Sequence, residues 1–322
     1  MGLLYIIGNG FDLHHHVKSE YKHFAWWLKQ HDIDLYDTYR RVCSYNALWQ
    51  DFERGMAYVS RSYFLDMAMP FLPSLKSREE ADLTMAEIYL AGDWGTDFAV
   101  DLVDRLKMRF SQWIASIKVP ADYDTCKVDI DTNARFFSFN YTDFLESRYG
   151  VNPDNIVYIH GKRKQEENNL IVGHGENGDD IFDEWYQKIS KYRPILKKGK
   201  KRYVPTPYLK LYRPPTCYIP EFQYLTEHIE IYYKESQKPV KTIIETQKNY
   251  FKSLHDITEI IVMGFSFSAV DMPYLKAIMA SNDAFEDVKW KVSKYSGDDE
   301  IRAINRLTEI GINHAKIDFF KM

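Results

Sequence analysis

The feature that most constrains this chain is one pattern that occurs three times: an apolar run, a polar turn and a helical stretch. The first copy is LLYII followed by GNGFD at residues 3–12. The second is ARFFSFNYTDFLESRYG at residues 134–150, and the third is TEIIVMGFSFSAVDMPYLKAIMA at residues 258–280. Short apolar runs bounded by turn residues are typical of buried strands, and strands that alternate with helices favour a parallel sheet. The pattern therefore predicts an α/β fold in which helices cover a parallel sheet.

Three further strands and two insertions complete the predicted organisation. NIVYIHG, DVKWKVSKY and HAKIDFF each have the composition of a strand. Residues 45–120 carry apolar side chains at helical spacing, for example at Phe98 and Leu102, and predict a helical insertion. Residues 162–255 begin polar and proline-rich and continue as helical stretches, which predicts a second insertion of loop and helices. We expect residues 1–322 to form a single domain around this sheet.

The composition is that of a globular protein and argues against several classes of function. A chain of 322 residues that is 45% hydrophobic and 27% charged can bury a sizeable core. Its net charge of −4 is unsuited to binding polyanions, and we interpret the basic run KKGKKR at 197–202 as a solvated loop and not as a nucleic-acid contact. No apolar run approaches membrane-spanning length, and no basic flank precedes the first one. We therefore expect a soluble cytoplasmic protein without a membrane partner.

The sequence predicts no metal site. Its cysteines, Cys43, Cys126 and Cys217, are too scattered for a disulfide framework or a zinc site made of four thiolates, and they suit a reducing compartment. Three consecutive histidines at 14–16 cannot all face one ion from a helix, and the HExxH spacing of zinc proteases is absent.

Polar residues follow the predicted strands at the position where a parallel sheet binds its ligands. Such ligands lie in the crevice beyond the carboxyl ends of the strands. The candidate site residues that share this position are Gly8, Asn9, Gly10, Phe11, Asp12, Asn140, Asp143, His160, Gly161, Gly264, Ser266, Phe267, Ser268 and Asp271.

The glycine turn after the first strand has two interpretations. Gly8 and Gly10 allow a tight turn whose N–H groups can face a phosphate. The dehydrogenase fingerprint is incomplete, because Leu13 stands where its third glycine belongs, and no Lys-Ser/Thr pair of a P-loop follows. The alternative is a turn that merely connects a strand to a helix.

Three strand-end side chains are candidates for chemistry. His160 suits acid–base work, because imidazole titrates near neutral pH, although a structural histidine would also fit, and His174 is a weaker candidate. Asn140 can donate and accept hydrogen bonds and so could hold a sugar hydroxyl or a water, or it could shape the turn. Asp143 could be a functional carboxylate or could cap the helix that begins there.

Five motifs in order resemble the AbiH family of bacteriophage abortive-infection proteins: IIGNGFD, WQDFE, FFSFNYTDFLE, YIHG and GFSFSAVD, over residues 5 to about 315. AbiH in turn looks like a distant member of the Rossmann-like, sirtuin-like NAD-binding fold. The resemblance implies that Gly8, Gly10 and Asp12 hold NAD, and that Asn140, Asp143 and His160 flank the nicotinamide ribose. It further implies that Gly264, Ser266 and Ser268 close the site. Asn9 and Phe11-Asp12 depart from the sirtuin glycine turn, and Asp12 would repel a phosphate but could bind a ribose hydroxyl.

The resemblance implies an NAD glycohydrolase that depletes NAD and halts an infected cell. Asn140 would orient the ribose or the attacking water, His160 would accept a proton, and Asp143 or Asp12 would stabilise the positive centre. The missing four-cysteine zinc module argues against protein deacetylation. Two alternatives stay open: a non-catalytic nucleotide sensor that signals to a partner or homo-oligomer, and a nucleic-acid-directed toxin. The expected partners are a nucleotide and a phage-derived trigger.

Overall fold

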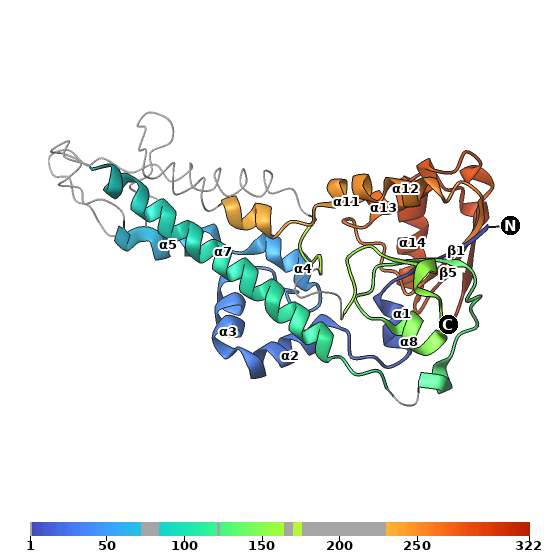
Figure 1. The fold of residues 1–322 in the computed structure, drawn as a ribbon, viewed down its shortest axis with the longest axis horizontal. Helices are drawn as coiled ribbons and strands as arrows, with labels where there is room; N and C mark the ends of the chain where they lie inside the picture. Colours follow the sequence, from blue (N-terminus) through green and yellow to red (C-terminus); the bar gives the residue numbers. More distant parts are fainter. Residues whose placement is uncertain (1, 72–83, 121–122, 164–169, 176–229) are drawn as a thin grey trace. The chain divides into compact units, whose positions relative to one another are not determined.

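In the computed structural model, which describes residues 2–71, 84–120, 123–163, 170–175 and 230–322, six strands form one parallel sheet (Figure 1). The strands are β1 (Gly2–Ile7), β2 (Arg135–Ser138), β3 (Ile156–Tyr158), β4 (Ile257–Met263), β5 (Lys289–Ser293) and β6 (Ile317–Phe320). Their order is β3-β2-β1-β4-β5-β6, and every neighbouring pair is parallel. From β1 the chain adds β2 and β3 on one side, and it then adds β4, β5 and β6 on the other side. Sheets of this topology bind ligands at the point between β1 and β4 where the strand order reverses.

Helices cover both faces of the sheet. Figure 1 shows α11 (Val240–Thr246), α12 (Lys248–Lys252), α13 (Met272–Ala280) and α14 (Gly297–Glu309) on one side, and α1 (Asn9–His14) and α8 (Phe144–Tyr149) on the other. Alternate side chains of the strands, such as Leu4, Ile6 and Val262, pack against Leu275 of α13 and Leu307 of α14. On the opposite face, Tyr5 stacks on Phe136 with ring centroids 4.8 Å apart. Burial of both faces explains why these strands are almost continuously apolar.

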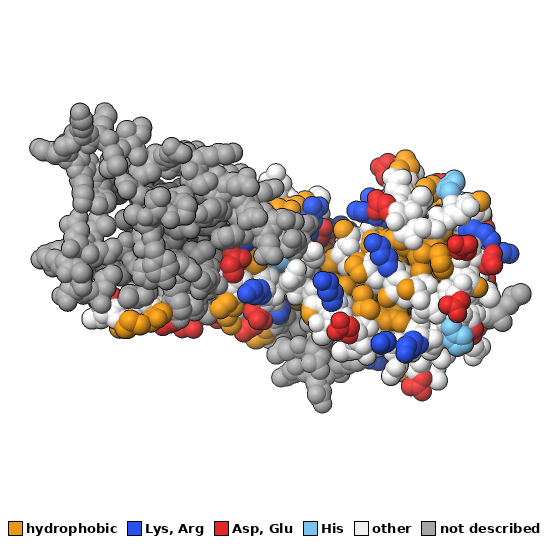
Figure 2. Space-filling view, turned by 90° about the horizontal axis from the view of Figure 1, so that it is seen from above, with side chains coloured by type: hydrophobic (Ala, Val, Ile, Leu, Met, Phe, Trp, Pro, Cys, Tyr) orange, Lys and Arg blue, Asp and Glu red, His pale blue; other side chains and the backbone are white. Residues whose placement is uncertain are grey.

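Part of the apolar surface of the covering helices reaches solvent. Figure 2 views the side on which α11 and α13 lie, and hydrophobic side chains lie there between charged ones. Val240, Ile244 and Ala277 of these helices are partly buried against the core.

The chain divides into two compact units, of which the first contains the sheet. That unit comprises residues 1–31, 107–175 and 238–322, and the second comprises residues 32–106 and 176–237. The first also contains α2 (Tyr21–His31), and the second contains α3 (Ile33–Val42), α4 (Phe52–Gly55) and α5 (Arg61–Ala68). The boundary at residues 106–107 falls inside the long helix α7 (Met85–Ser116).

Short 3-10 helices connect these elements. They are η1 (Met56–Tyr58), η2 (Met69–Phe71), η3 (Tyr123–Cys126), η4 (Pro153–Asn155), η6 (Phe285–Asp287) and η7 (His314–Lys316).

The second unit has its own core, in which Arg61 donates to Glu230 at 2.9 and 3.3 Å and stacks over the Tyr233 ring at 3.8 Å. None of the helices in the described residues is long and apolar enough to cross a membrane.

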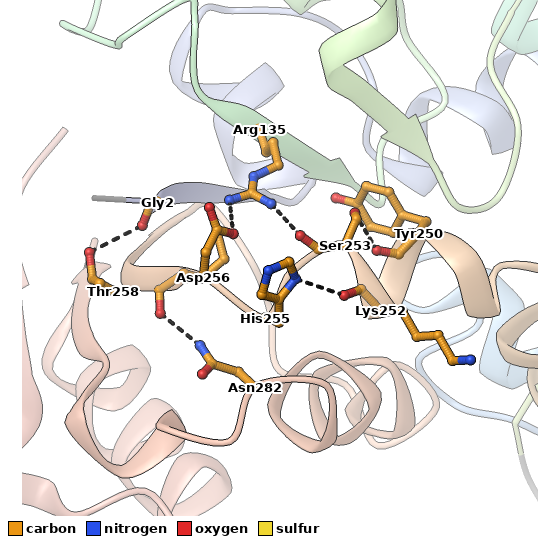
Figure 3. A network of polar contacts seen from close by, with 10 residues as sticks. Gly2, Arg135, Tyr250, Lys252, Ser253, His255, Asp256, Thr258 and Asn282 are labelled. Carbon is orange, nitrogen blue, oxygen red and sulfur yellow. Dashed lines mark hydrogen bonds and ion pairs between the residues drawn. The ribbon is translucent and has the colours of Figure 1, made fainter.

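A polar network fixes the amino-terminal ends of β1, β2 and β4 (Figure 3). Arg135 at the start of β2 donates to the Ser253 carbonyl at 2.6 Å and to Asp256 Oδ1 at 2.5 Å. Asn282, after α13, donates to the Ile257 carbonyl at 2.7 Å. These contacts hold the edge of the sheet opposite to the candidate site, so they bear on stability and not on chemistry.

The predicted α/β fold is confirmed, because the three repeated strand segments are neighbouring strands of one sheet. The strands end earlier than the apolar runs do: β2 ends at Ser138 and β3 at Tyr158, although Phe139 and Ile159 continue the apolar pattern and are buried. The N–H groups of Phe139 and Ile159 make the last hydrogen bonds to the neighbouring strands, at 2.9 Å to the Ile7 carbonyl and 3.0 Å to the Ser138 carbonyl, so the polar residues that follow lie beyond the sheet edge.

Candidate active site

The turns after β1 and β4 pack backbone against backbone at the centre of the sheet. The Gly8 N–H donates to the Met263 carbonyl at 2.9 Å, and the Gly10 N–H donates to the Gly264 carbonyl at 2.8 Å. A Cβ on Gly10 would lie 2.7 Å from the Gly264 Cα, and one on Gly264 would lie 2.0 Å from the Phe11 nitrogen. Gly264 also has a φ of +62°, so glycine is required there by both space and backbone conformation.

This contact occupies backbone N–H groups of the glycine turn, which the sequence suggested could bind a phosphate. The Phe11 N–H also donates within the turn, to the Gly8 carbonyl at 2.9 Å. In this conformation the N–H groups of Gly8, Gly10 and Phe11 therefore serve the turn itself. The Asn9 side chain is bound to Ser19, whose hydroxyl donates to Asn9 Oδ1 at 2.6 Å, and the Phe11 ring is fully buried.

Asp12 is the centre of a buried polar group that joins α1 to the segment after β2. Its Oδ1 accepts a hydrogen bond from Asn140 Nδ2 at 2.9 Å, and its Oδ2 accepts one from the Thr142 hydroxyl at 2.6 Å. The three side chains are at most 5% exposed. Burial raises the pKa of Asp12 to about 6, although both hydrogen bonds and the nearby Arg163 act in the opposite direction. Sequence reasoning did not single out Thr142, whose hydroxyl is indistinguishable in the sequence from that of an ordinary turn residue.

One polar atom of the Asn140 side chain has no hydrogen-bond partner in the part of the chain that the structure describes. Its backbone N–H donates to the Ser138 hydroxyl at 3.2 Å, and its Nδ2 is bound to Asp12. Its Oδ1 is buried and has no hydrogen-bond partner among the residues that the structure describes. A buried amide oxygen without a partner costs free energy unless a ligand or water donates to it.

Asp143 forms an ion pair and is not a helix cap. It occupies the N-cap position of α8, but its side chain makes no capping hydrogen bond. Instead, Arg163 donates to Asp143 Oδ1 through Nε at 2.5 Å and to the Ile117 carbonyl through Nη1 at 2.6 Å. Arg163 is 8% exposed, so this pair is largely withdrawn from water. Its partner comes three residues after His160, a spacing that gives no signal in the sequence.

His160 is a buried histidine whose ring is held by aromatic neighbours. The rings of Phe139 and Tyr274 lie edge-on to it, with centroids 5.7 Å away in each case. The side chain is 2% exposed, and burial together with the charge of Lys238 lowers its pKa well below the ordinary value. Its Nε2 has no hydrogen-bond partner within the described ranges. The ring is therefore neutral at pH 7 and can accept a proton.

Asp271 and Lys238 place opposite charges near this ring. Asp271, directly before α13, has its Oδ1 4.0 Å from His160 Nε2, which is too far for a direct hydrogen bond. An oxygen atom about 2.8 Å from both could bridge them. Lys238 is 5% exposed, and its N–H donates to the His174 carbonyl at 2.9 Å. Sequence reasoning missed Lys238, which lies in a long segment without motifs.

The remaining candidates of the β3 and β4 turns shape the backbone or face solvent. Gly161 has a φ of +80°, and its N–H donates to the Tyr158 carbonyl at 3.1 Å. Phe267 is buried with a φ of +55°, and it packs on Phe265 with ring centroids 4.9 Å apart. The Ser268 carbonyl accepts from the Asp271 N–H at 3.0 Å, whereas the Ser266 side chain is exposed.

The side chains of the three consecutive histidines contact different partners. His15 is buried between the Phe11 carbonyl at 2.7 Å and the Tyr149 hydroxyl at 2.6 Å. His14 Nε2 contacts the Cys126 carbonyl at 2.9 Å, and His16 Nε2 contacts Cys126 Sγ at 3.3 Å. Over the described ranges, no cluster of histidine, cysteine or carboxylate side chains has a geometry suited to a metal ion. Cys43 and Cys126 are free thiols, and Cys217 and the basic run at 197–202 lie outside the described residues.

A separate groove lies on the face of β4 and β5 away from the helices α11–α14. Its volume is about 590 Å³, and Ile261, Met263, Lys291 and Cys126 are among its lining residues. It includes neither Asn140 nor His160. The candidate site is therefore the buried group at the carboxyl edge of β1 to β4 and not this groove.

Comparison of the sequence with known protein families gives one result. The model of a family described as "Bacteriophage abortive infection AbiH" matches residues 4–294. Neither the search of curated proteins nor the search of solved structures gives a match. The similarity to sirtuins stays a prediction.

Proposed function

The chain belongs to the AbiH family of bacteriophage abortive-infection proteins, and from that premise we propose that its sheet-edge site hydrolyses NAD⁺ between nicotinamide and ribose. Abortive infection of phage-infected cells is the role that family membership gives the chain. Loss of NAD⁺ would stop the metabolism of the cell and with it the multiplication of the phage.

Two buried polar atoms without partners carry the proposal. Asn140 Oδ1 and His160 Nε2 lie two residues beyond the ends of the adjacent parallel strands β2 and β3, and within the described part of the chain neither has a hydrogen-bond partner. Proteins satisfy almost all of their buried polar atoms, and exceptions are frequent at functional sites. A ribose with two hydroxyls, or a ribose and a water, would satisfy both atoms.

The chemistry needs little from the protein beyond position and charge. Water replaces nicotinamide at the ribose carbon, so NAD⁺ and water yield nicotinamide, ADP-ribose and a proton. Nicotinamide departs readily because its departure neutralises a pyridinium ring, and the ribose carbon becomes positively charged in the transition state. Groups that favour this charge more strongly in the transition state than in the bound substrate accelerate the reaction.

The described side chains divide these tasks. Asn140 Oδ1 would accept a hydrogen bond from a ribose hydroxyl or from the water, and neutral His160 would take up the proton. Asp271, whose Oδ1 lies 4.0 Å from His160 Nε2, would stabilise the charge that then develops on the ring. We assign this role to Asp271 because its carboxylate lies close to the His160 ring, whereas the carboxylate of Asp143 lies against Arg163 and that of Asp12 against Asn140 and Thr142.

The proposal is tested by incubating the full-length protein with NAD⁺ and measuring nicotinamide by chromatography. Asn140→Ala and His160→Ala should each lower the rate by about 10²–10⁴-fold, which is typical of a lost catalytic group. Asn133→Ala and His255→Ala are matched controls, because both side chains are exposed and lie away from the site. Equal NAD⁺ loss in wild type and the site variants would exclude this mechanism. A wild type that cleaves no NAD⁺ but melts at a higher temperature in its presence would instead be a nucleotide sensor.

A further inference from the structure

The hydrogen bond between Asp12 and Asn140 fixes which end of the Asn140 amide faces the ligand. An ionised carboxylate only accepts hydrogen bonds, so the amide end 2.9 Å from Asp12 Oδ1 must be the nitrogen. The same reasoning makes the Thr142 hydroxyl the donor to Asp12 Oδ2 at 2.6 Å. The carbonyl oxygen of Asn140 is left facing away from Asp12, and it has no partner among the described residues.

This arrangement leaves the Asn140 amide only one of the two orientations that an asparagine side chain can adopt. An isolated amide offers a donor end or an acceptor end by rotating its terminal bond through half a turn. In this site, rotation would place the amide oxygen against the Asp12 carboxylate and leave two acceptors facing each other in a buried space. Both side chains are at most 5% exposed, so water cannot readily relieve that conflict.

We propose that Asp12 is a positioning residue that makes Asn140 a hydrogen-bond acceptor, so that the site selects a ligand donating a hydroxyl at this point. The ligand class is a sugar carrying a free hydroxyl beside the reacting carbon. The proposal rests on the proposed function for the identity of that sugar as the nicotinamide ribose, but the polarity of Asn140 does not depend on it. Asp12 touches neither ligand nor water in this role, and it acts through Asn140.

The charge state of Asp12 decides the polarity. Burial raises its pKa to about 6, so the carboxylate is ionised at neutral pH and becomes protonated under mildly acidic conditions. The other charged or titratable groups that act on it are Arg163 and Asp143, which form an ion pair, and Tyr158, the last residue of β3. Once protonated, Asp12 can itself donate, and the Asn140 amide is then free to turn.

The side-chain amide of Asn140 provides a test that needs no ligand. In full-length protein labelled with ¹⁵N-asparagine, the Asn140 NH₂ signals, identified by their loss in Asn140→Ala, should shift with pH around a midpoint near 6. That titration should be absent in Asp12→Asn, and the exposed Asn133 signals should show none in either protein. An Asn140 signal that is indifferent to pH, or one that titrates equally in Asp12→Asn, would overturn the proposal.

The selection for a hydroxyl is tested by binding, with the melting temperature as readout. NAD⁺ and its analogues lacking the 2′- or the 3′-hydroxyl of the nicotinamide ribose are compared on wild type and Asp12→Asn. In wild type the 2′-deoxy analogue, which lacks the hydroxyl beside the reacting carbon, should bind at least tenfold more weakly than NAD⁺, and in Asp12→Asn this preference should shrink. Equal binding of all three by wild type would refute the selection.

The two tests separate the two proposals. If NAD⁺ neither binds nor is cleaved while the Asn140 amide titrates with Asp12, the proposed function fails and the positioning role of Asp12 stands. If NAD⁺ is cleaved but the amide does not follow Asp12, the reverse holds. A purely structural Asp12 would change the melting temperature of the variant without changing its preference between NAD⁺ and the deoxy analogue.

Discussion

Replacement of Asp12 by asparagine should stabilise this protein at neutral pH, although it removes an ionised group with two hydrogen bonds. Asparagine keeps the shape of the side chain, can accept from Asn140 Nδ2, and can donate to the Thr142 hydroxyl oxygen. It therefore resembles protonated Asp12 and avoids the burial of a negative charge.

The size of the gain follows from the pKa of Asp12. Burial raises that pKa from 3.8 to about 6, and each pKa unit corresponds to about 1.4 kcal/mol. The ionised carboxylate thus costs about 3 kcal/mol of folding free energy at pH values well above 6. Between about pH 4 and 6 the folded protein binds more protons than the unfolded chain, so the wild type gains stability as the pH falls. Below about pH 4 both states are protonated, and the advantage of Asp12→Asn should vanish.

The measurement is thermal unfolding of both proteins from pH 5 to 8. For a compact unit of this size, about 3 kcal/mol corresponds to a rise in the melting temperature of roughly 6–12 °C at pH 8. The exposed Asp154→Asn should leave the melting temperature unchanged at every pH. A variant that is less stable than wild type at pH 8, or whose gain is the same at pH 5, would refute the reasoning.

Three further predictions concern single contacts. Thr142→Val removes a donor to ionised Asp12, so the midpoint of the Asn140 amide titration should move to higher pH in the NMR experiment. Gly150→Ala should cost about 1–2 kcal/mol, the general cost of a left-handed residue with a Cβ, and Gly264→Ala should cost several times as much in denaturant unfolding. Both glycines have positive φ (+68° for Gly150 and +62° for Gly264), but of the two only Gly264 faces other atoms within 4 Å. Arg135 lowers the pKa of Asp256 through their hydrogen bond. Arg135→Ala should therefore lower the free energy of unfolding at pH 7 by at most about 1 kcal/mol, as expected for an exposed pair, and the melting temperature should fall slightly. This loss should fade as the pH falls below about 4 and wild-type Asp256 becomes protonated.

The sequence was sufficient for the fold because the fold depends on a coarse pattern. Apolar runs that alternate with helical stretches specify a covered parallel sheet wherever the exact ends of the strands fall. The ends themselves depend on hydrogen bonds between strands, so Phe139 and Ile159 continued the apolar pattern but lie outside β2 and β3.

The polar site was harder to predict because its partners are distant in sequence. Asp143 has the position and residue type of an N-cap, but Arg163, twenty residues later, takes its carboxylate. Asp12 lies 128 residues from Asn140, and no local spacing relates them. Gly10 resembles a phosphate-binding glycine because binding a phosphate and packing against another backbone both need a position without a side chain. The sequence of the turn does not show that Gly264 lies opposite it.

The contact between Gly10 and Gly264 also has a consequence for folding during synthesis on the ribosome. Strand β1 is made first, but its neighbour β4 begins only at residue 257. At roughly 5–20 residues per second, β1 waits at least about ten seconds for that partner, with one of its edges unpaired. Because the turn after β1 is completed by the turn after β4, an unfinished chain cannot assemble the central part of the site. A toxic activity located there would therefore be withheld from every nascent or truncated copy that ends before the turn after β4.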